Sequence, residues 1–452
     1  MSRILDIPLG DADLLTRLRR LLPLLGGTAS LRVFSLALTV VSTVVLTRIL
    51  GAADFGFYSI CLSWLAMAMT FGQLGMQPKL MREVSYDSVS GYRTLNSILR
   101  AGLATVLISA SLAVGGLLLL YGVILGHGGT AVFHGLLMAI WIVPAAALGA
   151  CFRGVLNGHN KPLQAMFFAD PLQRGLLLLM LLGLYWLDRP AMSGFTALVF
   201  YGLSTVIVSA FALLLMLRSW GAKRVPQESV RRFGRAWLVS GTLIAVVTGL
   251  QAMASNLDVM MLGLLSSQAE AGLYRAATRG ADFVGFGLAI MAPVFMPRAA
   301  RAFGAGNFEE LKRLSANMGA GAFLIGLLIA LPLLLFAEPA LSVFGPGFFQ
   351  VAPAMRVLVI GQLFNAFCGP VAALLMVTRR ERLALVSLAT SLLVNGVLNY
   401  VLIPLYGADG AAMATLAGTV VWNLLMLGIV WRTMRINCSA IAALPGWIAG
   451  GA

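Results

Sequence analysis

The sequence predicts an all-α polytopic membrane protein, with about twelve transmembrane helices in two parallel six-helix repeats around a central cavity. Hydrophobic residues make up 60% of the 452 residues and charged residues only 11%, too little polar surface for a soluble protein. Apolar stretches alternate with short polar loops, and nearly every Lys and Arg falls in every second loop. A short motif recurs in both halves of the chain.

A spanning helix needs about 20 mainly apolar residues. Twelve segments meet this requirement, and they are residues 29–48, 56–77, 95–124, 130–151, 163–187, 191–217, 237–262, 272–296, 315–337, 350–376, 383–404 and 409–431. Residues 1–27 combine leucines with arginines, which predicts a cytoplasmic amphipathic segment on the inner leaflet. The alternative for this segment is a solvated tail.

The basic residues orient the spans. With a cytoplasmic N-terminus, 25 of the 32 Lys and Arg lie on the inner side, two lie in outer loops and five lie within spans. This bias follows the positive-inside rule and predicts that both termini are cytoplasmic. The net charge of +15 is therefore explained by topology, and we expect no nucleic-acid partner.

An acidic-x-Gly-x-Tyr motif indicates an internal repeat. Its two copies are Asp54–Tyr58 and Glu270–Tyr274, and Arg82 and Arg298 recur at the same offset of 216 residues. Six spans per repeat is an even number, so both repeats start on the same side of the membrane. The predicted domains are an N-lobe at 28–217, a basic cytoplasmic linker at 218–235, a C-lobe at 236–433 and a short cytoplasmic tail at 434–452.

Several kinds of chemistry have no support in the sequence. The chain has no Gly-Lys dipeptide and hence no Walker A loop. Its histidines and cysteines show no metal-binding spacing, so we expect neither a metal site nor a cofactor. Short loops between the spans favour transport by the helices over catalysis in an extramembrane domain.

Ionisable residues within the spans are the candidate functional residues, because each costs at least about 2.5 to 3.5 kcal/mol at mid-membrane. They are Arg32, Asp170, Arg174, Asp258, Arg275, Arg279, Asp282 and Arg356. Asp170 and Arg174 share a helix face, which predicts either a structural ion pair or a place in a cavity. Arg32 lies within a turn of the inner interface, where it either snorkels to the surface or faces a cavity.

The eighth span has a polar stripe. Arg275, Arg279 and Asp282 follow i, i+4, i+7 spacing, Asp258 lies where it can neutralise one of these arginines, and Arg356 enters from the outer part of the tenth span. This net-positive set predicts a cavity for an anion, particularly phosphate, which arginine binds with two parallel hydrogen bonds. The alternative is that these charges pair with one another and close the outer end.

Several short runs together resemble the polysaccharide transporter family, the Wzx-type flippases of lipid-linked oligosaccharides, which belong to the multidrug/oligosaccharidyl-lipid/polysaccharide exporter superfamily. In the first half the similar runs are 47–51, 54–58, 74–75 and 81–83. In the second half they are Asp258, 272–275, 404–407, 410–412 and 414–415. In order and spacing the resemblance extends over all twelve predicted spans.

The resemblance implies two lobes whose cavity opens alternately to the two sides of a bacterial inner membrane. It implies a cargo of undecaprenyl-diphosphate-linked oligosaccharide, flipped for O-antigen or exopolysaccharide assembly, with polysaccharide polymerase and chain-length machinery as partners. A cationic cavity is typical of the family, and the residues placed to supply it are Arg32, Arg174, Arg275, Arg279 and Arg356. Arg48 and Arg82 lie at helix ends and are candidates for gating, and Asp170, Asp258 and Asp282 for ion coupling or charge pairing.

Three other functions remain open at this point. Two belong to the same superfamily, a multidrug exporter and a peptidoglycan-precursor flippase; the third is a membrane-embedded polysaccharide polymerase or ligase. An arginine-rich cavity is unfavourable for organic cations.

Neutral sugars of the cargo need hydrogen-bonding side chains in the cavity wall. The candidates are Gln73, Gln251, Asn256, Asn365, Asn395 and Asn399.

Overall fold

The computed structural model describes residues 11–73, 75–90, 104–112, 114–116, 130–188, 192–220 and 235–443. All secondary structure within these ranges is helical, and the predicted fold class is confirmed. The described part thus leaves out residues 1–10, most of the basic linker, the last nine residues of the tail and parts of the third predicted span.

The N-lobe comprises the helices before the basic linker. They are α1 (Asp11–Gly72), α2 (Met76–Ser90), α4 (Thr130–Leu136), α5 (Ala139–Gly158), α6 (Pro162–Phe167), α7 (Pro171–Asp188) and α8 (Gly194–Trp220). Residues 104–112 and 114–116 are also helical and fall within the third predicted span.

The C-lobe comprises the helices after the linker. They are α9 (Arg235–Leu265), α10 (Gln268–Ala281), η1 (Asp282–Gly285), α11 (Phe286–Gly304), α12 (Phe308–Leu335), α13 (Ala337–Ser342), η2 (Phe348–Val351), α14 (Ala352–Cys368), α15 (Val371–Val377), α16 (Glu381–Met434) and η3 (Ala440–Ala443).

Two of the long helices each contain a pair of predicted spans. Among the described residues, seven continuous helical stretches are long and apolar enough to cross a membrane, or eight if one bent pair is included. The stretches Phe34–Arg82 and Glu381–Met434, of 49 and 54 residues, are more than twice the roughly 20 residues that one crossing needs. Each therefore accounts for two spans of the prediction.

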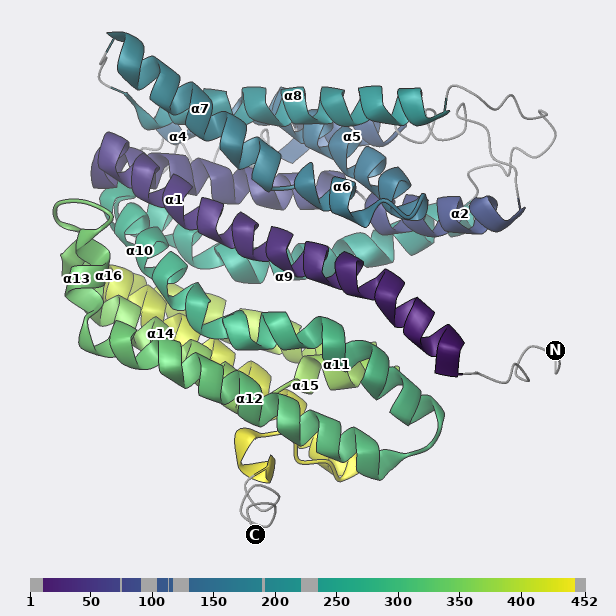
Figure 1. Cartoon of the computed structure of the whole chain (residues 1–452). Helices are drawn as coiled ribbons and strands as arrows, with labels where there is room; N and C mark the ends of the chain where they lie inside the picture. Colours follow the sequence, from purple (N-terminus) through teal and green to yellow (C-terminus); the bar gives the residue numbers. More distant parts are fainter. Residues whose placement is uncertain are drawn as a thin grey trace.

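A single glycine turns the chain within each of these helices. Gly51 in α1 has φ 73° and Gly407 in α16 has φ 54°, conformations that glycine adopts without steric cost. In α16 the two arms run antiparallel, because the Ser391 hydroxyl donates to the carbonyl of Gly418 at 2.8 Å across the turn. Figure 1 shows α1 likewise running to one end of the molecule and returning.

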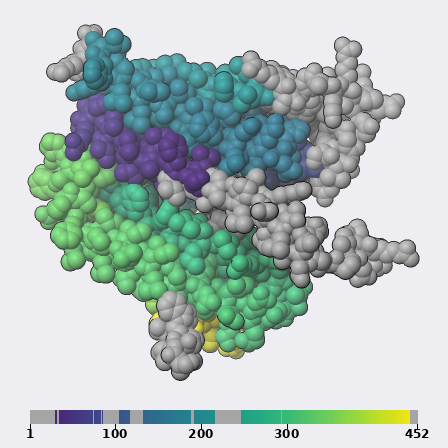
Figure 2. Space-filling view, viewed as in Figure 1, coloured from purple at the N-terminus to yellow at the C-terminus, as the bar shows by residue number. Residues whose placement is uncertain are grey.

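The two lobes form two layers. In Figure 1, α4 to α8 lie on one side, α11 to α16 lie on the other, and α1, α9 and α10 lie between them. In the space-filling view the purple and blue surface of the N-lobe lies against the green surface of the C-lobe (Figure 2). The largest cluster of buried apolar side chains draws on both lobes, with Leu65 and Leu198 from one and Leu262 and Val359 from the other.

The repeated motif places its two glycines against each other. A Cβ atom added to Gly56 would lie 3.1 Å from the amide nitrogen of Gly272, and one added to Gly272 would lie 2.9 Å from the amide nitrogen of Gly56. Each glycine also contacts a backbone carbonyl of the other lobe, Gly56 that of Gln268 and Gly272 that of Ala52. Residues 52 and 268 are themselves 216 positions apart, so the lobes meet here by a pseudo-twofold contact.

The acidic residue of each motif copy binds the N-terminus of the sixth predicted span of its lobe. The Asp54 carboxylate accepts a hydrogen bond from the amide of Gly194, at the start of α8, at 2.7 Å. The Glu270 carboxylate accepts one from the amide of Ala408, where the second arm of α16 begins. A carboxylate at a helix N-terminus satisfies a free N–H group and interacts favourably with the helix dipole. The equivalent roles support the internal repeat.

The eighth predicted span is broken rather than continuous. It comprises α10, the 3₁₀ turn η1 and α11, and a bend of 47° separates Gln268–Ala292 from Val294–Gly304. The bend falls at Pro293, and proline lacks the N–H that a continuous helix needs. Asp282 starts the 3₁₀ turn, and the polar stripe predicted for this span therefore ends at a change of helix type.

We expect Gly272→Ala to lower the melting temperature, because a methyl group at this position meets backbone atoms that cannot rotate away. Overpacking of this kind costs about 1 to 3 kcal/mol. Thermal unfolding in detergent checks this. Gly183→Ala on α7 is the matched control, since a Cβ there has no neighbour within 4 Å. Equal melting temperatures for the two variants would contradict the lobe contact.

Candidate functional site: a charged cavity between the lobes

A cavity of about 640 Å³ lies between the lobes. Its N-lobe wall includes Thr43 and Tyr58 of α1 and Arg174 of α7. Its C-lobe wall is formed by residues of α9, α10, η1, α14 and α16. Of the ionisable residues predicted from the sequence, the structure brings six to this cavity, namely Asp170, Arg174, Asp258, Arg275, Arg279 and Asp282.

Arg275 joins the two lobes through neutral partners. Its Nη2 atom donates to the Ser63 hydroxyl of the N-lobe at 3.3 Å and to Oδ1 of Asn256 in α9 at 3.0 Å. No carboxylate of the described residues forms an ion pair with this guanidinium. Arg275 thus remains a cation at the cavity wall whose charge no directly paired carboxylate balances.

Arg174 lines the opposite side of the cavity. The sequence left open whether Arg174 and Asp170 form a structural ion pair, and in the part of the chain described here they form none. Arg174 is half-buried on α7 and Asp170 is exposed just before that helix begins. Both side chains therefore contribute charge to the cavity itself.

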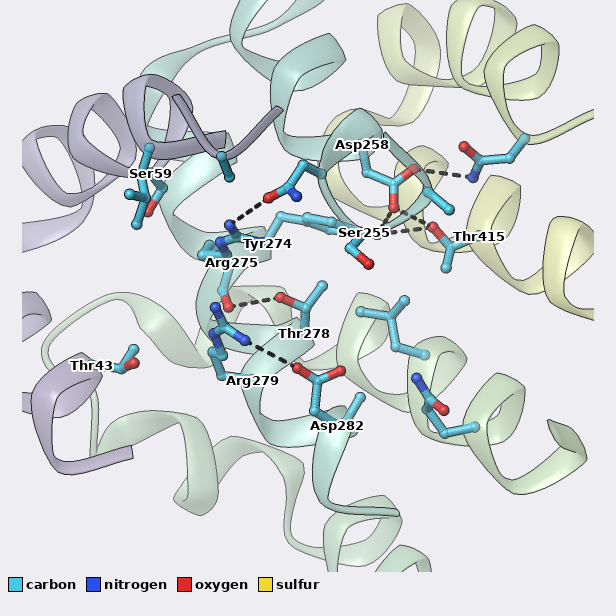
Figure 3. Close-up of a pocket in the computed structure, with 18 of the residues that line it drawn as sticks. Thr43, Ser59, Ser255, Asp258, Tyr274, Arg275, Thr278, Arg279, Asp282 and Thr415 are labelled. Atoms are coloured by element: carbon cyan, nitrogen blue, oxygen red, sulfur yellow. Dashed lines mark hydrogen bonds and ion pairs between the residues drawn. The ribbon is translucent and has the colours of Figure 1, made fainter. Parts of the chain in front are cut away.

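Arg279 and Asp282 form an ion pair within the cavity. Nη1 of Arg279 lies 3.4 Å from Oδ2 of Asp282, and the two side chains are 32% and 53% exposed (Figure 3). At such exposure the pair is partly solvated, and ion pairs of this kind contribute little to stability. Three arginines and three aspartates now line the cavity, so the described lining is formally balanced, in contrast to the net-positive set predicted from the sequence.

Asp258 lies in a cage of neutral donors. Its carboxylate accepts hydrogen bonds from Tyr274 at 2.8 Å, Thr415 at 2.7 Å, Asn395 at 3.0 Å and Asn399 at 2.7 Å. The sequence suggested that Asp258 neutralises an arginine, whereas the structure places Tyr274 between Asp258 and Arg275 (Figure 3).

The cage draws on three elements, α9, α10 and both arms of α16. The Oδ1 atom of Asn399 is buried and has no hydrogen-bond partner among the described residues. Among the described residues the cage thus contains one carboxylate, no basic residue and one carbonyl oxygen, that of Asn399, without a hydrogen-bond partner.

The remaining predicted residues lie elsewhere. Arg356 lies outside the cavity, where it donates to the carbonyl of Leu334 at 3.2 Å and pairs with Glu338 at 3.5 Å. Arg48 is exposed at the turn of α1, and its Nε donates to the Val343 carbonyl of the C-lobe at 2.8 Å. Arg82 is exposed on α2. Arg32 belongs to α1, but its side chain is outside the described part of the structure.

The sequence did not predict which residues surround Asp258, nor which amide side chains of α14 and α16 line the cavity. Asn395 and Asn399 stood only among the candidates for sugar contact, and Thr415 only within a family-like run. Asn395 and Asn399 are spaced i, i+4 in an apolar span, and this spacing could have indicated that both side chains face a polar site. Gln362, Trp422 and Asn423, which also line the cavity, were missed, because α14 and α16 lie far from α7 and α10 in the chain.

The sequence and the fold match known proteins. The family described as polysaccharide biosynthesis protein matches residues 27–303, and the MatE family matches residues 244–401. A search of curated protein sequences found no match.

Three solved structures illustrate the likeness in fold. A multidrug resistance MATE family transporter of the MOP superfamily, in an inward-facing conformation, has a TM-score of 0.66 at 16% identity, over 88% of this chain and 98% of that chain. The lipid II flippase MurJ, in an inward closed conformation, has a TM-score of 0.70 at 12% identity, over 89% and 87%. A MOP superfamily transporter from Pyrococcus furiosus has a TM-score of 0.58 at 17% identity, over 94% and 95%.

The fold is similar to that of these solved transporters, and the long apolar helices indicate a multi-pass membrane protein with a cavity between two lobes. The chain belongs to the polysaccharide biosynthesis protein family, which matches more than half of its residues. The resemblance found in the sequence is thereby confirmed.

Proposed function

We propose that this transporter is a flippase for an undecaprenyl-diphosphate-linked oligosaccharide. It moves the repeat unit from the cytoplasmic to the periplasmic leaflet by alternating access, for O-antigen or exopolysaccharide assembly. Both termini lie in the cytoplasm and the chain resides in the bacterial inner membrane, in agreement with the distribution of basic residues. Polysaccharide polymerase and chain-length machinery are the expected partners.

The observation that supports this cargo is a pair of arginines from opposite lobes that face one cavity and form no ion pair with a carboxylate of the described residues. They are Arg174 and Arg275. Because a charge within the membrane is costly, such residues normally meet a partner there. The planar guanidinium forms two parallel hydrogen bonds to phosphate, so a diphosphate held between the lobes supplies that partner. The lipid chain stays in the bilayer while the headgroup crosses.

The same observation separates the proposal from its rivals. Arginines that line a cavity repel organic cations, which is unfavourable for a multidrug exporter of such compounds. A peptidoglycan-precursor flippase also requires phosphate binding, so the two flippase functions differ in the rest of the headgroup. A membrane-embedded polymerase or ligase is disfavoured because the loops between the predicted spans are short and leave little room for an extramembrane catalytic domain.

Contacts at one end of the lobes support alternating access. The Gly56 and Gly272 backbones touch there, and Arg48 binds the Val343 carbonyl across the lobes. By the predicted topology this is the periplasmic end, so these contacts close the cavity to the outside. Rocking of the lobes has to separate them, and Arg48 then acts as part of the outer gate. Arg82 stays a second gating candidate.

Asp258 is the residue that we assign to ion coupling. Its cage contains oxygen atoms from a carboxylate, two amides and two hydroxyl groups. Oxygen ligands of this kind suit a proton or a hard monovalent cation. The buried Oδ1 of Asn399, which has no hydrogen-bond partner in the described part of the chain, adds an acceptor that a cation satisfies. Asp170 is exposed and Asp282 is paired with Arg279, which makes them weaker candidates.

We expect the double variant Arg174→Gln, Arg275→Gln to slow flipping of a fluorescent lipid-linked oligosaccharide at least about tenfold, because two charge-assisted contacts to the diphosphate are lost. Proteoliposomes with a quencher outside measure the rate. Arg356→Gln is the matched control, since this arginine lies outside the cavity. An unchanged rate in the double variant, with the protein folded, would remove these arginines from the mechanism.

We expect Asp258→Asn to abolish the acceleration of flipping by an ion gradient, because the cage loses its charge. The rate is measured in proteoliposomes with a sodium gradient, a proton gradient or none, and size-exclusion chromatography checks folding. Asp282→Asn is the control and keeps the response. If Asp282→Asn loses the response while Asp258→Asn keeps it, the coupling residue is Asp282.

We expect Arg48→Ala to shift the protein towards the state that is open at this end, about two- to tenfold in population, because one charge-assisted bond between the lobes is lost. Spin labels on Ala53→Cys and Gln350→Cys, both exposed at this end, report the distance between the lobes. Arg313→Ala, an exposed arginine on α12, serves as control. Identical distance distributions in both variants would exclude gating by Arg48.

A further inference from the structure

The charges of the cavity come from both lobes, but not from all of the helices that line it. All six charged lining residues lie on the turn before α7, on α7 itself, on α9, on α10 or at the start of η1. Every lining residue from α14 and α16 is neutral, and the polar ones carry amide or hydroxyl groups. The cavity therefore offers two chemistries side by side, a charged wall and a neutral hydrogen-bonding wall.

Three amides and one indole form the part of the neutral wall that lies apart from the Asp258 cage. Gln362 and Asn365 are spaced i, i+3 on α14 and share a face, while Trp422 and Asn423 follow each other on the second arm of α16. Nδ2 of Asn423 donates to Oδ1 of Asn365 at 3.1 Å and joins the two helices. We call these four residues the amide wall.

The amide wall has hydrogen-bonding capacity that the protein does not use. The Oδ1 atom of Asn423 is buried without a partner among the described residues, although Nδ2 of the same side chain makes two bonds. A buried acceptor left unsatisfied is unfavourable, so a small shift of this side chain that brings Oδ1 within reach of a donor in the cavity is favourable. Within the described part of the chain, the Gln362 amide also makes no hydrogen bond to side chain or backbone, so its donors and acceptor are available to a ligand.

The chemistry of this wall matches an uncharged saccharide. Sugar hydroxyls both donate and accept, as amides do, and the apolar face of a pyranose ring packs on an indole such as Trp422. A peptide stem with carboxylates finds no cation on this wall. A lipid chain finds too many polar groups.

We propose that Gln362, Asn365, Trp422 and Asn423 form the subsite for the neutral sugars of the cargo, while Arg174 and Arg275 hold the diphosphate. This inference rests on the proposed function and assigns the glycan to α14 and α16. The C-lobe then binds the sugars, which are the part of the headgroup that differs between lipid-linked glycans.

The test compares two cargos in proteoliposomes at limiting concentration. One is a polyprenyl diphosphate with a single sugar, and the other bears a neutral tetrasaccharide. Trp422→Ala and the double variant Gln362→Leu, Asn365→Leu should each slow the tetrasaccharide cargo about five- to tenfold more than the single-sugar cargo. The matched controls are Trp431→Ala, an exposed tryptophan on the same helix, and Gln251→Leu, an exposed amide on α9.

A second measurement does not depend on flipping. Saturation-transfer NMR with the lipid-free tetrasaccharide and the detergent-solubilised full chain should show binding to the wild type and to Trp431→Ala, and loss of binding in Trp422→Ala. Sugar binding that depends on Trp422, in a protein that flips neither cargo, would refute the flippase and leave the subsite standing. Flipping of both cargos with unchanged rates and sugar binding in the amide-wall variants would refute the subsite alone.

Discussion

The arrangement of the whole molecule depends on one close contact, the approach of the Gly56 and Gly272 backbones. Only residues without a side chain allow two helices to meet at this distance, so both copies of the repeated motif are placed by the same constraint. Once the glycines touch, the acidic residue two positions earlier lies at the start of the sixth helix of its own lobe, and the tyrosine two positions later lies at the cavity. One motif thus sets the lobe interface, the end of a neighbouring helix and the cavity lining.

The cavity combines groups with different energetic roles. Asp258 is buried and accepts four hydrogen bonds from neutral groups, whereas Arg174 and Arg275 come from opposite lobes and line the cavity without a paired carboxylate among the described residues. A buried carboxylate is within reach of a proton or a small cation only, while arginines that line a cavity can meet a larger anion. This difference explains why we assign coupling to the aspartate and cargo binding to the arginines.

Composition and charge distribution were sufficient to predict the fold class and most of the spans, because the cost of exposing polar groups to lipid acts on each segment separately. The repeat was predicted from the motif that recurs at an offset of 216 residues. The site was predictable only in part. Arg174, Arg275 and Arg279 reach the cavity as expected, but Arg356 pairs with Glu338 outside it, since depth in the membrane does not determine the direction in which a side chain points. The partners of Asp258 come from both arms of a hairpin that turns at Gly407, and spacing along the chain does not reveal such neighbours.

In the proposed function, Arg275 links binding of the cargo to movement of the two lobes. Its Nη2 atom holds Ser63 of the other lobe and Asn256 of its own, so a phosphate oxygen that takes this donor competes with a bond between the lobes. Thermodynamic linkage is reciprocal: a ligand that weakens the lobe contact binds more tightly to the state in which that contact is already broken. Under the proposed function, an occupied cavity therefore favours separation of the lobes, and an empty cavity favours the arrangement seen in this structure.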